Sequence, residues 1–178
     1  GVDKGLHVRL EEDEGGVGLG FADLSLVAIQ LGKGLVPVPF VATAVLAART
    51  LTRADDAALR AELLLRLIDG DWLPALAWQE ARASLDPTAR EVVCTNGRLN
   101  GGKCFVPDAG GADAFIVSAA EAGGTALYLV ERDAPGVTLG FEQRVDGGFF
   151  AEVRFADTPV GARLVAPERG AAALEIGR

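Results

Sequence analysis

The sequence has almost none of the side chains that build metal centres or disulfide frameworks. Its 178 residues include one histidine, His7, two cysteines, Cys94 and Cys104, and no methionine. Two cysteines are too few for a disulfide framework, and together with one histidine they lack the number and spacing of a zinc site. We therefore interpret both cysteines as reduced thiols of a cytoplasmic protein, and His7 as a solvated surface residue instead of a member of a catalytic triad.

Long apolar runs and an excess of positive charge are also missing. The longest uncharged stretch, Gly34–Ala48, contains Pro37 and Pro39 and is shorter than the roughly 20 apolar residues that a membrane-spanning helix needs. With 17 Lys and Arg residues against 25 Asp and Glu residues, the net charge of −8 would repel a phosphate backbone. We expect neither a membrane span nor nucleic acid as a partner.

Apolar residues recur at helical spacing up to about residue 72, and this pattern predicts three helices. Their apolar positions lie in the segments Leu24–Leu31, Val41–Ala48 and Leu59–Ile68. Asp55 is predicted to cap the start of the third helix, and Gly32 and Gly70 are predicted to end the first and the third. Pro37 and Pro39 are expected to separate the first two helices.

From Leu73 onward, short runs of β-branched and aromatic residues alternate with turn residues, which is typical of an all-β unit. Asn96 and Gly97 predict a hairpin turn between the strands Arg90–Thr95 and Arg98–Val106, because both central positions of such a turn favour positive φ. Further strands are predicted at Pro74–Trp78, Ala114–Ala119, Ala126–Glu131, Val137–Leu139 and Phe150–Phe155. These strands predict a barrel or a sandwich, and Glu168–Arg178 is expected to begin another helix.

Two glycine-rich segments approach nucleotide-binding patterns without completing them. The sequence GRLNGGKC at Gly97–Cys104 nearly matches a phosphate loop, but Cys104 stands where a hydroxyl should ligate magnesium, and a strand follows instead of a helix. The glycines of Gly16–Gly20 begin a dinucleotide fingerprint whose third glycine position holds Phe21. We therefore interpret neither segment as a nucleotide site.

Four carboxylates lie near predicted strand ends, where a general base could be placed: Glu80, Asp86, Asp108 and Asp113. Nothing in the sequence indicates a partner that would tune the pKa of any of them, so we interpret each as a turn residue. The acidic run Glu11–Glu14 is interpreted as a solvated face and not as a cation site. The residues alone therefore predict a helical unit followed by a β unit, with no self-contained catalytic apparatus.

The order of these features resembles the acyl-CoA dehydrogenase family. Gly18–Phe40, GLGFADLSLVAIQLGKGLVPVPF, resembles the family's helix followed by an LGR-type turn and a PVP segment. Leu76–Asp86, LAWQEARASLD, stands where the family has a TEP…GSD loop, and Gly97–Val106, GRLNGGKCFV, resembles its hairpin and the strand beside the flavin. Tyr128–Val137, YLVERDAPGV, and Phe149–Pro159, FFAEVRFADTP, resemble the following strand and turn and the exit from the middle domain.

In that family an amino-terminal helical domain, a middle β-barrel and a carboxy-terminal four-helix domain enclose FAD, with the acyl chain between the flavin and the helices. The resemblance implies a partial amino-terminal helical domain at 1–72, the middle β-barrel at 73–165 and the start of the carboxy-terminal domain at 166–178. The implied fold is α+β, with a helical segment before a seven- to eight-stranded antiparallel β-barrel, truncated before a C-terminal helical bundle.

The resemblance also assigns residues to the cofactor site. Leu76, Trp78 and Gln79 would lie along the flavin and Ser84 near the cofactor or the CoA pyrophosphate, and the isoalloxazine edge would be bordered by Phe105, Val106 and Pro107. Backbone donors at that edge would stabilise charge as the flavin accepts hydride, and apolar walls would exclude water.

Several positions depart from the family pattern. Gln79 replaces a Thr, Ala81 and Arg82 replace a Pro-Gly pair, and Pro107 replaces a Thr whose amide reaches the flavin, a hydrogen bond that proline cannot donate. These changes resemble the divergent small subunits of heteromeric acyl-CoA dehydrogenases such as pimeloyl-CoA dehydrogenase. The family's catalytic base is a Glu supplied from beyond Arg178, so no residue here is assigned as the catalytic base.

The resemblance therefore implies an FAD-dependent acyl-CoA dehydrogenase of fatty acid metabolism, present as a fragment or small subunit that is inactive alone. Its implied partners are an acyl-CoA substrate, an electron-transfer acceptor, and identical or homologous subunits of a homo- or hetero-oligomer. Two alternatives stay open: a non-catalytic subunit that stabilises an active partner, and a stand-alone barrel that binds an apolar ligand.

Overall fold

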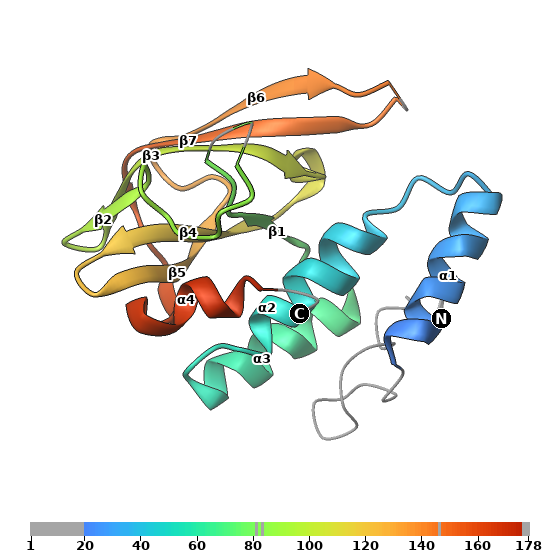
Figure 1. Ribbon diagram of the computed structural model, residues 1–178, viewed down its shortest axis with the longest axis horizontal. Coiled ribbons are helices and arrows are strands. Elements are labelled where there is room, and N and C mark those ends of the chain that lie inside the picture. The colour runs from blue at the N-terminus through green and yellow to red at the C-terminus, as the bar shows by residue number, and fades with distance from the viewer. Residues whose placement is uncertain (1–19, 81, 83, 146, 176–178) are drawn as a thin grey trace.

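The computed structural model describes residues 20–80, 82, 84–145 and 147–175, in which helices are followed by a sheet and a last short helix (Figure 1). The helices before the sheet are α1 (Phe21–Lys33), the π-helix η3 (Phe40–Ala47), α2 (Ala48–Leu51) and α3 (Ala57–Asp69). A short 3₁₀ helix, η4 (Ala109–Gly111), lies between two strands, and α4 (Pro167–Ala173) follows the last strand. Positions 1–19, with His7, Glu11–Glu14 and most of the Gly16–Gly20 segment, lie outside the described residues.

The three predicted helices before the sheet are confirmed, with corrections at two of their ends. Asp56, and not Asp55, caps α3, because its carboxylate accepts the N–H groups of Ala58 and Leu59 at 2.8 and 3.1 Å. Gly70 ends α3 in the left-handed conformation at φ 69°, as predicted. Gly32 lies inside α1, which ends at Lys33.

Asp55, which was predicted to cap α3, instead bonds to the end of the sheet and to α4. Its backbone N–H donates to the carbonyl of Leu164 at 2.8 Å, and its carboxylate accepts the N–H of Ala166 at 2.7 Å and pairs with Arg169. The residue just before α3 is thereby joined to the end of the sheet and to α4. A capping position and the position before it are both acidic here, so the sequence alone did not distinguish them.

The sheet has eight strands and is mostly antiparallel. The strands are β1 (Pro74–Ala77), β2 (Val93–Thr95), β3 (Arg98–Pro107), β4 (Ala114–Glu121), β5 (Gly124–Glu131), β6 (Val137–Gln143), β7 (Phe149–Pro159) and β8 (Ala162–Val165). Their pairing order is β6-β7-β3-β2-β4-β5-β8, with β1 paired to β4. The pairs β1–β4 and β2–β4 are parallel, and within the described residues the pairing order stays open between β6 and β8.

The predicted fold class is confirmed, with one strand more than the sequence pattern showed. The predicted hairpin joins β2 to β3, and Asn96 and Gly97 have φ values of 52° and 72°. The added strand is β8, whose four residues follow β7 after a turn at Gly161. A run this short carries too little alternation to be recognised from sequence.

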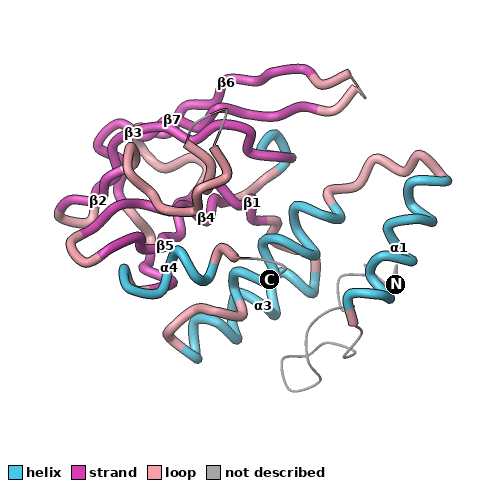
Figure 2. Tube along the Cα trace, in the orientation of Figure 1, coloured by secondary structure: helices cyan, strands magenta, loops and turns pink. Residues whose placement is uncertain are grey.

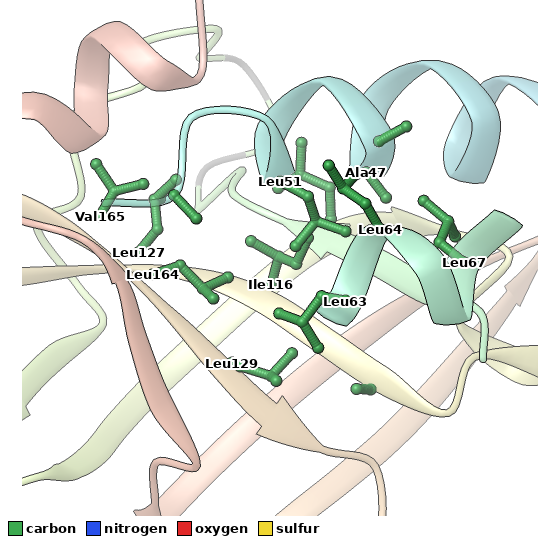
Figure 3. Close-up of a cluster of buried hydrophobic side chains, with 14 of the residues drawn as sticks. Ala47, Leu51, Leu63, Leu64, Leu67, Ile116, Leu127, Leu129, Leu164 and Val165 are labelled. Atoms are coloured by element: carbon green, nitrogen blue, oxygen red, sulfur yellow. The ribbon is translucent and has the colours of Figure 1, made fainter. Parts of the chain in front are cut away.

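Two apolar cores lie on opposite faces of the sheet. Figure 3 shows the first, where Leu51, Leu63 and Leu64 of the helices point towards Ile116, Leu127 and Leu164 of the sheet. The second core lies on the other face and includes Phe115, Val117, Leu99, Val130 and Val153. Because successive residues of a strand point to opposite faces, β4 places Ile116 in one core and its neighbours in the other. The helices η3, α2, α3 and α4 thus cover one face of the sheet, whereas α1 lies apart from it (Figure 2).

Except for Gly97 in the hairpin turn, the near-match to a phosphate loop lies within β3, so the prediction that this segment leads into a strand and not a helix is confirmed. Gly101 has a φ of +128° in this strand, and a Cβ there would lie 2.5 Å from the carbonyl oxygen of Glu91. The glycine therefore permits a close approach of two backbone segments and is not part of an anion cradle.

Candidate functional site

The candidate site forms where the chain leaves β1 and runs beside the end of β3. The backbone N–H of Cys104 donates to the carbonyl of Gln79 at 2.8 Å, so the Trp78–Gln79 segment continues alongside β3. The register of β3 against β7 shifts between Lys103 and Val106, and Phe105 has a φ of 52° in this bulge. Bulges re-aim side chains at the ends of strands. Trp78 and Phe105 are therefore on adjacent segments, as the resemblance implies.

The side chains assigned to the cofactor site from sequence differ in their exposure. Leu76 and Val106 are 3% and 1% exposed and belong to the two different cores, so only their backbones can border a ligand. The side chains of Trp78, Gln79, Ser84, Phe105 and Pro107 are half-buried. The amide of Gln79 donates to the carbonyl of Ser84 at 3.0 Å, which brings Ser84 back towards the end of β1.

Two aromatic rings in contact, one from the bulge in β3 and one from β7, each have an arginine guanidinium over them. The ring of Phe105 meets the ring of Phe150 edge to face, with centroids 5.5 Å apart. The guanidinium of Arg82 lies 5.1 Å from the centroid of Phe105, and that of Arg144 lies 4.7 Å from the centroid of Phe150. Such cation–aromatic contacts are favourable. Arg82 also pairs with Glu142, whose pKa this contact lowers.

A large apolar groove opens beside Pro107. It has a volume of about 1390 Å³ and runs between the segment that joins α1 to η3 and the end of the sheet around η4 and the β6–β7 hairpin. Its lining includes Leu35, Phe40, Pro107, Phe141 and Phe149, and its charged lining residues are Asp108 and Arg144. Burial raises the pKa of Asp108, although Arg144 acts in the opposite direction. The groove is suited to an apolar ligand with at most a few polar groups.

Behind the bulge lies a buried polar network that sequence analysis missed. Lys103 of β3 has a fully buried side chain, and its ammonium donates to Glu80 at 2.7 Å, to Ser118 at 2.8 Å and to the carbonyl of Trp78 at 3.2 Å. The prediction that Glu80 is an ordinary turn residue is wrong. A lysine at an inward position of a strand requires a buried acid, and this was the signal available from sequence.

The other three carboxylates have local contacts. The carboxylate of Asp86 accepts the N–H of Thr88 at 2.9 Å, which confirms its prediction as a turn residue. Asp108 has a φ of 54° just before η4, and the carboxylate of Asp113 accepts the N–H of Leu73 at 2.8 Å. Cys94 and Cys104 are free and buried.

In the described part of the chain, no group of three or more His, Cys, Asp and Glu residues is arranged to hold a metal ion. Among the same residues, no helix combines the length and the apolar character that crossing a bilayer requires.

No protein-family model matches this chain, but comparisons with individual proteins find several relatives. Acyl-CoA dehydrogenase FadE27 of Mycobacterium tuberculosis is 30% identical over 139 residues, which make up 78% of this chain and 37% of the relative. A variant of the Tcur3481-Tcur3483 steroid ACAD is 28% identical, with a TM-score of 0.78, over 96% of this chain and 47% of that one. PigA with FAD and proline is 26% identical, with a TM-score of 0.79, over 95% and 49%.

The chain thus shares the arrangement of helices and mixed sheet found in oxidoreductases of the flavoprotein kind, and it spans less than half the length of these relatives. The curated relative is named as an acyl-CoA dehydrogenase and the first of these structures as a steroid ACAD, so the resemblance found in the motifs of this chain is confirmed.

Proposed function

We propose that this chain is part of an FAD-dependent acyl-CoA dehydrogenase, in which it supplies helical packing and the β wall of the cofactor site. The observation that carries the proposal is the meeting of the Trp78–Gln79 segment with the bulge at Phe105, beside the apolar groove that Pro107 lines. A flat aromatic cofactor needs an apolar surface of this kind, with polar groups at its edges. The similarity to an acyl-CoA dehydrogenase supports the assignment.

The residues at the bulge fit a flavin ring on its apolar side. Phe105 and Pro107 offer half-buried apolar surface, and Gln79 and Ser84 place polar groups next to them. Two positions at this edge offer no free backbone donor, because Pro107 has no N–H and the N–H of Cys104 is bonded to the carbonyl of Gln79. FAD, when bound, would accept a hydride from the substrate. This chain would then hold the ring on one side and exclude water, while donors to the ring come from other parts of the assembly.

The apolar groove is the proposed site of the acyl chain. Its lining from the α1–η3 segment and the β6–β7 hairpin is mostly apolar, as a hydrocarbon ligand requires. One relative is described as a steroid ACAD, so a polycyclic acyl group is a candidate substrate alongside a linear one. Measuring turnover or binding with both kinds of acyl-CoA distinguishes them.

We assign removal of the substrate α-proton to a residue outside this chain. Glu80 is the most buried candidate, but its two oxygens accept one N–H from each of Arg90, Glu91 and Val92 and one bond from Lys103. Burial raises its pKa, and these bonds more than offset that effect, so the pKa lies below its ordinary value. A carboxylate with four donors and a lowered pKa is a poor proton acceptor.

The proposed domain organisation follows the family, with 1–72 as part of the helical domain, 73–165 as the middle β domain and 166–178 as the start of the next helical domain. We further propose that the chain acts within a homo- or hetero-oligomer that passes electrons to a separate acceptor. A relative named as a Tcur3481-Tcur3483 pair supports a hetero-oligomer. A cytoplasmic location stays a prediction from the cysteine content.

The test is to purify the whole protein and record its visible spectrum before and after anaerobic addition of an acyl-CoA. A flavin band that bleaches supports the dehydrogenase. A colourless protein that still associates with a homologous subunit supports the alternative of a non-catalytic, stabilising subunit. Phe105→Ala should reduce the bound flavin, whereas Leu65→Ala, exposed on α3, should not. Equal flavin content in both variants would contradict the placement of the ring.

A further inference from the structure

The buried network around Lys103 joins four separate parts of the chain. Lys103 lies in β3, Ser118 lies in β4, Glu80 follows β1, and the N–H groups that Glu80 accepts belong to the segment before β2. The ammonium of Lys103 has three protons and donates to three oxygens, so its hydrogen-bonding capacity is filled. A fully satisfied buried network fixes the relative positions of the segments that it joins.

Three consecutive N–H groups enclose the carboxylate of Glu80. Those of Arg90 and Glu91 donate to one oxygen at 2.8 Å each, and that of Val92 donates to the other at 3.0 Å. Successive N–H groups that converge in this way form an anion-binding nest. Here the anion is the protein's own side chain, so the nest fastens the 90–92 segment to the segment after β1.

The same contacts hold both sides of the candidate cofactor site. Lys103 binds the carbonyl of Trp78, and the next residue, Cys104, donates its N–H to Gln79. The bulge with positive φ at Phe105 comes one residue later. A positive φ at a phenylalanine is unfavourable and persists only where its surroundings hold it in place. The hydrogen bonds of Lys103 and Cys104 fix the backbone on the amino-terminal side of the bulge.

We propose that Glu80 and Lys103 form a positioning pair that sets the distance and orientation between the Trp78–Gln79 segment and the Phe105 bulge, and thereby the geometry of bound FAD. Neither side chain touches the cofactor in this proposal, and both act through the backbone that they hold. The effect on FAD rests on the proposed function, whereas the effect on the backbone does not.

The first experiment measures amide hydrogen exchange without cofactor in wild type and Glu80→Gln. Glutamine has one side-chain oxygen and one NH₂ group in place of the two carboxylate oxygens. Whichever way the amide is turned, two of the four donors therefore lose their acceptor. We expect exchange at the 90–92 amides and at Cys104 to become at least about tenfold faster, with β4 and β5 unchanged. Glu62→Gln is the matched control, because Glu62 is exposed on α3 and lies outside the network.

The second experiment measures FAD affinity and the visible circular dichroism of bound FAD in the same whole-protein variants. We expect Glu80→Gln to weaken FAD binding by about tenfold or more and to change the dichroism, and we expect Glu62→Gln to behave like wild type. A residue that only stabilised the fold would lower the unfolding temperature and leave both readouts unchanged. If Glu80→Gln does not fold, the double variant Glu80→Gln/Lys103→Met removes both buried charges and is measured in the same way.

The two experiments test the effect of the pair on the backbone and its effect on FAD separately. Unchanged exchange at 90–92 and at Cys104 overturns the pair itself. Faster exchange with unchanged affinity and dichroism overturns its effect on FAD. A wild-type protein that binds no FAD overturns the proposed function together with that effect, and the exchange data still decide whether Glu80 and Lys103 hold the backbone.

Discussion

Replacing Gly101 with alanine tests how β3 and the segment before β2 come together. Gly101 lies in β3 at a φ of +128°, and an added Cβ would lie 2.5 Å from the carbonyl oxygen of Glu91 and 2.8 Å from the Cα of Val92. Both neighbours are backbone atoms, so no side chain can rotate away. The methyl group can be accepted only if the 91–92 segment moves off β3.

The expected magnitude has two sources. Holding an alanine at this φ costs about 1–3 kcal/mol, and forcing an extra carbon into a filled space costs about 1–3 kcal/mol. Alanine lowers the entropy of the unfolded chain, which offsets about 0.4–1 kcal/mol of this. We expect Gly101→Ala to lower the free energy of unfolding by about 1–5 kcal/mol. Because the 91–92 segment also bonds Glu80, its amide exchange should rise as well.

Gly102→Ala is the matched control, one residue further along the same strand. No atom lies within 3.4 Å of a Cβ at Gly102, the nearest being the Cγ of Arg154 and the carbonyl oxygen of Val153 at 3.8 Å. Its effect should stay within about 1 kcal/mol. Urea unfolding of both variants, followed by tryptophan fluorescence, measures the difference. Equal stabilities for the two variants would refute the close approach that we describe for Gly101.

Three further changes test other parts of the structure. Burial lowers the pKa of Lys103 from 10.5 to about 8 despite its salt bridge. Between pH 8 and pH 10.5 the unfolded chain therefore keeps a proton on Lys103 that the folded chain has lost. The free energy of unfolding should therefore rise with pH across that window in wild type, and Lys103→Met should remove the rise in urea midpoints. Asp56→Ala removes the cap of α3 and should cost about 1 kcal/mol by thermal unfolding, and no loss would contradict the cap. Gly170→Ala would place a Cβ 1.9 Å from the carbonyl oxygen of Thr125 and should lower the free energy of unfolding in urea by at least about 1–3 kcal/mol. Gly140→Ala is its control and should be nearly neutral, because no atom lies within 4 Å of a Cβ at that position.

Much of the fold was predictable because its signals are local. The Asn96–Gly97 turn, the prolines between the first two helices and the glycine that ends α3 each act through the backbone preferences of one or two residues. The strand predicted at Phe150–Phe155 lies within β7, where alternation buries Ala151, Val153 and Phe155. The parallel pairing of β1 and β2 with β4 could not be predicted in this way, because it joins segments far apart in the chain.

The candidate site was predictable only through the family resemblance. That resemblance assigned Trp78 and Phe105 to one site, and the structure places their segments side by side. Periodicity alone could not show this, because the contact depends on a bulge that shifts the register of β3. The exposure of individual side chains was also beyond the resemblance, which could not distinguish the buried Leu76 and Val106 from their half-buried neighbours.

Glu80 shows that the shape of a binding site can depend on residues that do not face the ligand. A strand with Leu99, Gly101 and Lys103 at alternate positions points a lysine inward, and burial of its charge is costly without an acid. Glu80 supplies that acid from 23 residues away in sequence, and the nest at 90–92 supplies the donors that keep it ionised. Replacing the pair with apolar residues would remove the cost of the buried charges, but also the three hydrogen bonds that fasten the 90–92 segment to the segment after β1. The buried charges are thus best explained by the placement of these backbone segments, and less by any net gain in stability.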